Sequence, residues 1–159
     1  MTQSPSRPAS AARAPTWVEE AYSRAGRSLA AGTAYFLALF GAGWTLGPIR
    51  EFVVRRGFDP LLAVLIEAAP MLLVMGLASA WALRQFRVRD RAGDRLLVGS
   101  VAVTLVIASE FAGGALVRGW GFYETLTNMT TWPGRVFVTL LIVALLTPLL
   151  EPLGRRKSA

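Results

Sequence analysis

Two glutamates lie inside apolar stretches that are long enough to cross a bilayer, and their carboxylates offer the clearest chemistry in this chain. Glu67 lies in the stretch from Leu61 to Leu83, and Glu110 lies in the stretch from Leu96 to Val117. A charged carboxylate in hydrocarbon costs on the order of a few kcal/mol, so each one marks a candidate functional site. In such surroundings a carboxylate can bind a cation or exchange protons.

Further charges are predicted at the depth of these two glutamates. At ~1.5 Å per residue, Glu67 lies ~9 Å from the point where its helix enters the membrane. Glu110, on a helix that enters from the opposite side, lies ~21 Å into a hydrocarbon core of ~30 Å, which is about the same level. Arg50 and Glu51 end the first span near that level, and Arg118 lies about two turns beyond Glu110. These five residues are therefore predicted to form one charged layer.

The charged layer allows three interpretations. In the first, its carboxylates form a polar pocket that binds a cation or relays protons. In the second, an arginine of the layer pairs with a glutamate and holds the helices together, a contact that contributes ~0.6–2 kcal/mol in a membrane. In the third, the charges contact another membrane subunit.

Prolines and glycines predict the shape and packing of the membrane helices. A proline removes one helical hydrogen bond, so kinks are predicted at Pro48, Pro70 and Pro148. A carbonyl freed in this way at membrane depth needs a neighbour, a water or an ion, and two of these prolines border the charged layer. Gly43 and Gly47 form a GxxxG motif, which predicts close packing against another helix.

The composition excludes several classes of chemistry. The 159-residue chain is 53% hydrophobic and 17% charged, has a mean hydropathy of +0.45, and contains no cysteine and no histidine. Disulfides, thiolate or imidazole metal sites and histidine-based catalysis are therefore excluded. The sequence holds no catalytic constellation, phosphate-binding loop or nucleic-acid module. We predict no catalytic residue, no metal, no cofactor and no nucleic-acid partner, and we attribute the net charge of +7 to contact with lipid headgroups.

The elements that must position these residues are predicted to be four antiparallel transmembrane helices in an all-α membrane bundle, preceded by a short interfacial helix. Asp59 is predicted to cap the second helix, and Thr130 or Thr131 the fourth. The loop between the third and fourth spans is rich in aromatic residues and is predicted to lie at the membrane interface. The predicted boundaries are a disordered tail over 1–15, the interfacial helix over 16–28, a membrane domain over 29–153 with spans at 29–53, 61–83, 96–117 and 133–153, and a basic tail over 154–159.

Lysine and arginine are distributed unequally between the two sides of this bundle. Four spans place both termini on one side, and that side carries twelve Lys and Arg residues against five on the other. Cytoplasmic loops carry the excess of these residues, so both termini are predicted to be cytoplasmic in a bacterial inner membrane. The charged layer then lies in the periplasmic half.

Three short motifs resemble small, uncharacterised four-span membrane proteins of bacteria. They are GPIRE at Gly47–Glu51, LLAVLIEAAPMLL from Leu61 to Leu73, and WALR at Trp81–Arg84. The resemblance covers the first two spans and implies an inner-membrane location without a particular activity. The topology is also similar to that of small multidrug transporters, but the first span here lacks their mid-membrane acid.

Two functions follow from these observations. We predict a small transport protein that handles cations or protons through Glu67 and Glu110, with the lipid bilayer, a second copy or another membrane subunit as its partner. The alternative is a structural or accessory subunit of a larger membrane complex, in which the same charges form interhelical pairs.

Overall fold

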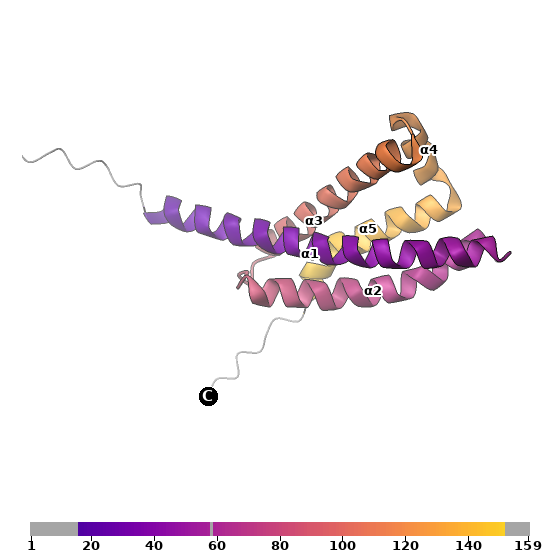
Figure 1. Ribbon diagram of the computed structural model, residues 1–159. Coiled ribbons are helices and arrows are strands. Elements are labelled where there is room, and N and C mark those ends of the chain that lie inside the picture. The colour runs from indigo at the N-terminus through magenta and orange to yellow at the C-terminus, as the bar shows by residue number, and fades with distance from the viewer. Residues whose placement is uncertain (1–15, 58, 152–159) are drawn as a thin grey trace, which may run out of the picture.

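The computed structural model describes residues 16–57 and 59–151, and every regular element within these ranges is helical. The elements are α1 (Thr16–Arg55), α2 (Pro60–Gln85), α3 (Ala92–Gly113), the π-helix η1 (Gly114–Arg118), α4 (Phe122–Thr130) and α5 (Trp132–Leu150) (Figure 1). The predicted all-α bundle is confirmed. The predicted tails over 1–15 and 154–159 lie outside the described residues.

The helix α1 is one continuous element of 40 residues. The segments predicted as an interfacial helix and a first span are consecutive parts of this single helix. Glu19 lies in its first turn, where the positive end of the helix dipole favours an acid. The helix passes through Pro48 and ends before Gly57, whose φ of 89° favours glycine.

Side-chain caps fix where two of the long helices begin. At the start of α2, the backbone N–H of Leu62 donates to Oδ1 of Asp59 at 3.1 Å, as predicted. At the start of α5, the backbone N–H of Gly134 donates to the Thr131 hydroxyl at 3.2 Å. Thr131 is therefore the cap of α5, whereas the Thr130 hydroxyl donates back to a carbonyl within α4.

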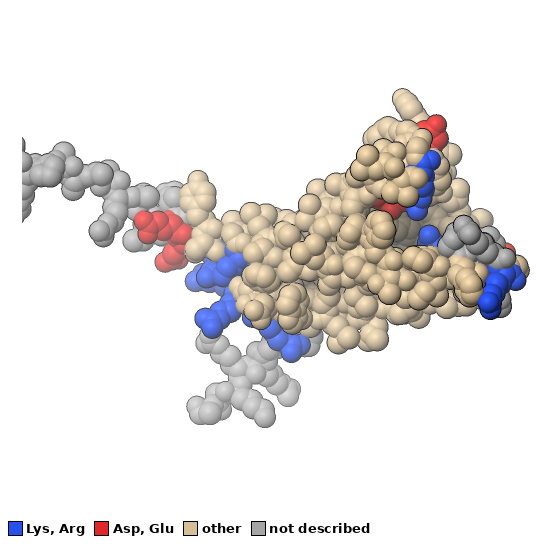
Figure 2. Space-filling model, in the orientation of Figure 1, with Lys and Arg blue, Asp and Glu red and all other residues tan. Residues whose placement is uncertain are grey.

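Four helices are long and apolar enough to cross a membrane. By length and composition, the candidate spans are Glu19–Arg50, Leu65–Gln85, Ala92–Arg118 and Trp132–Leu150. Figure 2 shows blue and red side chains gathered toward the two ends of the molecule, with a broad tan surface between them. This uncharged belt is the surface that a hydrocarbon layer requires.

The four long helices form two hairpins. The first hairpin is α1 with α2, and the second is α3 with α5, connected through η1 and α4. Helices α2 and α3 each pack against both α1 and α5, which places α1 diagonal to α5. We call the end that holds the loop between α2 and α3 (residues 86–91) the α2–α3 end, and the opposite end the α4 end (Figure 1).

The buried core lies mainly toward the α2–α3 end. Its members come from all four long helices: Ala31, Tyr35, Leu39, Met75, Ala78, Ala82, Leu83, Val98, Ala102 and Ala144. No described residue of α1 beyond Leu39 is buried. Toward α4 the helix α3 diverges from α1 (Figure 1), and Figure 2 shows the surface hollowed between α4 and α1. The hairpins are therefore packed together at one end and separate at the other.

Candidate functional site

The first charged pair joins the two helices of the first hairpin near the α4 end. A guanidinium N–H of Arg50, on α1, donates to Oε2 of Glu67, on α2, at 3.1 Å. The Glu67 side chain is 16% exposed and the Arg50 side chain is 38% exposed. The antiparallel course of α1 and α2 places the end of one helix beside the first turns of the other, so the pair forms without any contribution from α3 or α5.

The second charged pair joins two residues of one continuous helical segment, Glu110 on α3 and Arg118 on η1, and includes no residue of α5. A guanidinium N–H of Arg118 donates to Oε1 of Glu110 at 3.1 Å, and both side chains are more exposed than that of Glu67. Arg118 ends η1, a π-helical turn of the kind often found at functional sites. Its guanidinium also lies over the Trp120 ring, 4.8 Å from the ring centroid.

Four of the five residues of the predicted layer have described side chains, and these four form two separate pairs. Glu67 is paired with Arg50, and Glu110 is paired with Arg118. Among the described side chains at this end, no ion pair joins the first hairpin to the second. Glu51 belongs to α1, but its side chain lies outside the described residues. The chemistry predicted for these carboxylates remains a prediction.

A small cavity adjoins the first pair. It has a volume of about 90 Å³ and is lined by both charged residues and by apolar residues of α1 and α2: Leu46, Ile49, Ala63, Ile66 and Pro70. Pro70 has no N–H to donate to the carbonyl of Ile66, so an acceptor without its helical partner borders the cavity. The cavity has room for a few small species, since a water needs about 10–15 Å³ of this kind of volume.

At the third predicted proline kink, the carbonyl that the proline leaves without a donor has a hydrogen-bond partner that the sequence did not indicate. Pro148 cannot donate to the carbonyl of Ala144, and the buried hydroxyl of Tyr35 donates to that carbonyl at 3.3 Å. This bond crosses from α1 to α5, so it joins the two hairpins. A tyrosine inside an apolar span is the signal that could have indicated it, because a buried phenol requires a partner. The helices α1, α2 and α5 all continue through their prolines.

The closest helix contacts are made by glycines other than the GxxxG pair. A Cβ built at Gly43 or Gly47 meets no atom within 4 Å, so neither glycine packs closely against another described part of the chain. A Cβ at Gly32 would lie 2.7 Å from Cβ of Val101, between α1 and α3. A Cβ at Gly99 would overlap the carbonyl oxygen of Leu145, between α3 and α5.

A third charged cluster lies at the α2–α3 end and was missed by the sequence reasoning. Arg95 donates to the carbonyls of Glu151 at 2.8 Å and Pro148 at 3.4 Å, and it pairs with Asp90 at 3.0 Å. The Arg95 side chain is 12% exposed. Arg95 thus joins the first turns of α3 to the C-terminal end of α5. A cation at a helix C-terminus also interacts favourably with the dipole of that helix, here α5.

The fold alone defines the class of protein, because no model of a protein family matches the chain, nor does any curated protein or solved structure. The described residues contain no group of three or more carboxylates, imidazoles or thiols that could hold a metal ion. The four candidate spans identify a multi-pass, all-α membrane protein. The resemblance to small four-span bacterial proteins stays a prediction.

Proposed function

We propose that the protein is a structural or accessory subunit of a bacterial inner membrane, in which the Arg50–Glu67 pair holds the two helices of the first hairpin together. The observation that carries this proposal is the pairing of Glu67 with Arg50 at 3.1 Å, with the carboxylate largely enclosed. The guanidinium of Arg50 occupies Oε2 of Glu67, and its positive charge disfavours a second cation beside the same carboxylate. Losing one partner of an enclosed pair leaves an uncompensated charge, so the pair stabilises the contact between α1 and α2. We call an ion pair with this structural function a clasp.

The distribution of positive charge supports an orientation with both termini in the cytoplasm. The loop between α2 and α3 and the first turn of α3 contain Arg87, Arg89, Arg91 and Arg95, and α1 contributes Arg24 and Arg27 on the same side. The positive-inside rule assigns this side to the cytoplasm. The α4 end and both ion pairs then lie toward the periplasm. The surface hollowed between α4 and α1 at this end is the region that we infer another subunit or a second copy contacts (Figure 2).

Cation or proton handling is the second candidate function. The small cavity beside Glu67 favours it, because the cavity brings a carboxylate together with the carbonyl of Ile66, which lacks its helical donor. In this function the guanidinium of Arg50 would leave Glu67 when a cation or proton arrives. The two candidates make different demands on position 67, since a clasp needs a charge opposite to that of residue 50 and a cation site needs an acid.

A charge-swap experiment distinguishes the two functions. We expect the single variants Arg50→Glu and Glu67→Arg to accumulate poorly in the membrane, because each places like charges together. The double variant Arg50→Glu with Glu67→Arg restores the pair in reverse and is expected to restore accumulation. The corresponding swap of Glu110 and Arg118 is the control, and it is expected to change less because that pair is more exposed.

Flux measurements complete the test. The wild-type protein, the double swap and Glu67→Gln are reconstituted in liposomes, and proton and monovalent-cation movement is followed with dyes. A clasp predicts no flux that depends on residue 67. If Glu67→Gln accumulates normally, and the wild type carries a flux that this variant and the double swap both lack, the accessory function is overturned in favour of transport.

A further inference from the structure

The short helix α4 differs in character from the four long helices. It has nine residues and joins the third candidate span to the fourth. At 100° per residue, Phe122 and Leu126 fall on one side of the helix, and Glu124 and Asn128 fall on the other. The helix is therefore amphipathic.

Two close contacts hold α4 against its neighbours. Thr125 is buried, and a Cβ at Gly114 of η1 would lie 3.0 Å from its hydroxyl oxygen. On the α5 side, a Cβ at Gly134 would overlap the carbonyl oxygen of Asn128. These contacts fix the rotation of α4 about its own axis, so the two sides of the helix have defined directions.

The apolar side of α4 is mostly exposed in the described chain, although the Phe122 ring stacks on the Phe111 ring of α3 with the ring centroids 5.1 Å apart. Phe122 is 62% exposed and Tyr123 is 81% exposed, and Leu126 is also exposed. The segments that flank α4 in the chain also expose apolar residues: Leu116, Val117 and Trp132. Apolar surface costs roughly 25 cal/mol per Å² when water covers it, so this surface requires an apolar neighbour.

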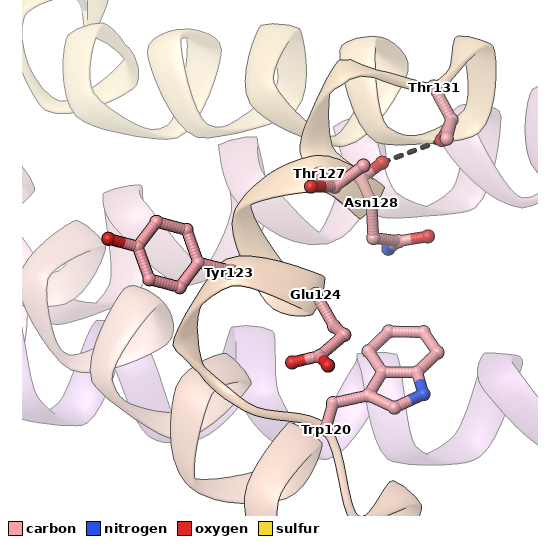
Figure 3. Close-up of a pocket in the computed structure, with 6 residues that line it drawn as sticks. All are labelled: Trp120, Tyr123, Glu124, Thr127, Asn128 and Thr131. Carbon is pink, nitrogen blue, oxygen red and sulfur yellow. Dashed lines mark hydrogen bonds between the residues drawn. The ribbon is translucent and has the colours of Figure 1, made fainter.

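The polar side of α4 faces a different environment. It borders an open depression of about 430 Å³ lined by Trp120, Tyr123, Glu124, Thr127, Asn128 and Thr131. Figure 3 shows the Tyr123 ring pointing away from Glu124, Asn128 and Trp120, so the phenol lies toward one edge of the helix and the polar groups toward the other. The carboxylate and the amide are suited to water.

Arginine–aromatic pairs flank α4 along the chain on both sides. Arg118 lies over Trp120 just before the helix, and Arg135 lies 5.1 Å from the Trp132 ring centroid just after it. Tryptophan is enriched at the level of lipid headgroups, and arginine there reaches phosphate groups. Because α4 directly connects two spans, its distance from the bilayer is set by those spans.

We propose that α4 lies flat in the headgroup layer of the leaflet at the α4 end, with the lipid bilayer as the partner of its apolar side. Phe122 and Leu126 reach the boundary of the acyl chains, and Glu124 and Asn128 face water. This docking to lipid rests on the membrane-spanning class of the protein and is independent of the role of the ion pairs.

Single-cysteine labelling tests this placement, because the chain contains no cysteine of its own. The variants Leu126→Cys and Phe122→Cys probe the apolar side, and Glu124→Cys is the matched control on the same helix. Each is labelled with a nitroxide in liposomes of phosphatidylethanolamine and phosphatidylglycerol. Collision with oxygen and with a water-soluble nickel chelate is then measured by electron paramagnetic resonance.

The labels at 126 and 122 are expected to collide preferentially with oxygen and to lie about 5–10 Å into the headgroup and acyl boundary. The label at 124 is expected to collide preferentially with the nickel chelate. Equal access of nickel to all three labels would show that α4 stands away from the bilayer. Immobile labels at 122 and 126 that neither reagent reaches would show that protein, from this chain or a second copy, covers the surface instead of lipid. Either result overturns the proposal.

Discussion

The two ends of the bundle are held together by different kinds of contact. At the α2–α3 end, most contacts between helices involve backbone atoms. Gly32 and Gly99 allow neighbouring helices to approach closely. Tyr35 donates to the carbonyl of Ala144, and Arg95 donates to carbonyls at the end of α5. The contacts of Gly32 and Tyr35 join one hairpin to the other, and those of Gly99 and Arg95 close the second hairpin. At the α4 end one described ion pair joins α1 to α2, and the other lies within the segment formed by α3 and η1.

This difference explains why the hairpins separate toward α4. A charged pair satisfied within its own hairpin has no remaining charge to attract the other hairpin. Close backbone contacts, in contrast, bring whole helices together and are intolerant of added atoms. Substitutions at the α2–α3 end are therefore expected to lower the unfolding free energy strongly, and substitutions at the α4 end are expected to lower it little. Three pairs of substitutions test this expectation, each with one member at each end.

The largest difference is expected between Gly99→Ala and Gly43→Ala. The added methyl group at position 99 overlaps the Leu145 carbonyl, which is backbone and cannot move alone, so we expect a loss of about 3 kcal/mol in unfolding free energy. At position 43 the methyl group meets no atom within 4 Å, so we expect no loss and a gain of up to roughly 1 kcal/mol. Unfolding in mixed detergent micelles measures both. Equal effects would show that the described close contact at Gly99 is absent in the membrane.

The second comparison is Arg95→Gln with Arg135→Gln. Arg95 is enclosed and donates to two carbonyls at the end of α5, so its loss is expected to cost about 1.5–3 kcal/mol. Arg135 is exposed, donates to the Thr130 carbonyl and stacks on Trp132, so its loss is expected to cost less than about 1 kcal/mol. Limited proteolysis at the end of α5 gives a second measurement, because α5 is expected to fray there in Arg95→Gln. Unchanged proteolysis in that variant would contradict the role assigned to Arg95.

The third comparison is Tyr35→Phe with Tyr123→Phe. Removing the buried hydroxyl leaves the Ala144 carbonyl without a donor, which is expected to cost about 1–2 kcal/mol, whereas the exposed Tyr123 hydroxyl is expected to contribute almost nothing. Pro148→Ala supplies an internal control. It returns a backbone N–H to the Ala144 carbonyl, so in that background Tyr35→Phe is expected to cost less. An unchanged cost in the double-mutant cycle would show that the hydroxyl acts elsewhere.

Local sequence patterns predicted the elements well, and they predicted the contacts between helices less well. The capping roles of Asp59 and Thr131 follow from residues three positions apart, so local reasoning was sufficient. The GxxxG motif at Gly43 and Gly47 is equally visible in the sequence, but whether it meets another helix depends on how α1 is rotated. Gly32 and Gly99, which do meet helices, carry no motif that distinguishes them from the other glycines.

The sequence by itself determined four apolar helices, their approximate ends, and the presence of acids and arginines toward one end of the bundle. These properties depend on composition and on spacing within a single helix. The tertiary structure decided which arginine meets which glutamate, which glycines lie in close contact, and that Tyr35 binds the carbonyl freed by Pro148. The physical reason is that these contacts depend on the rotation and tilt of each helix against its neighbours, which non-local packing sets.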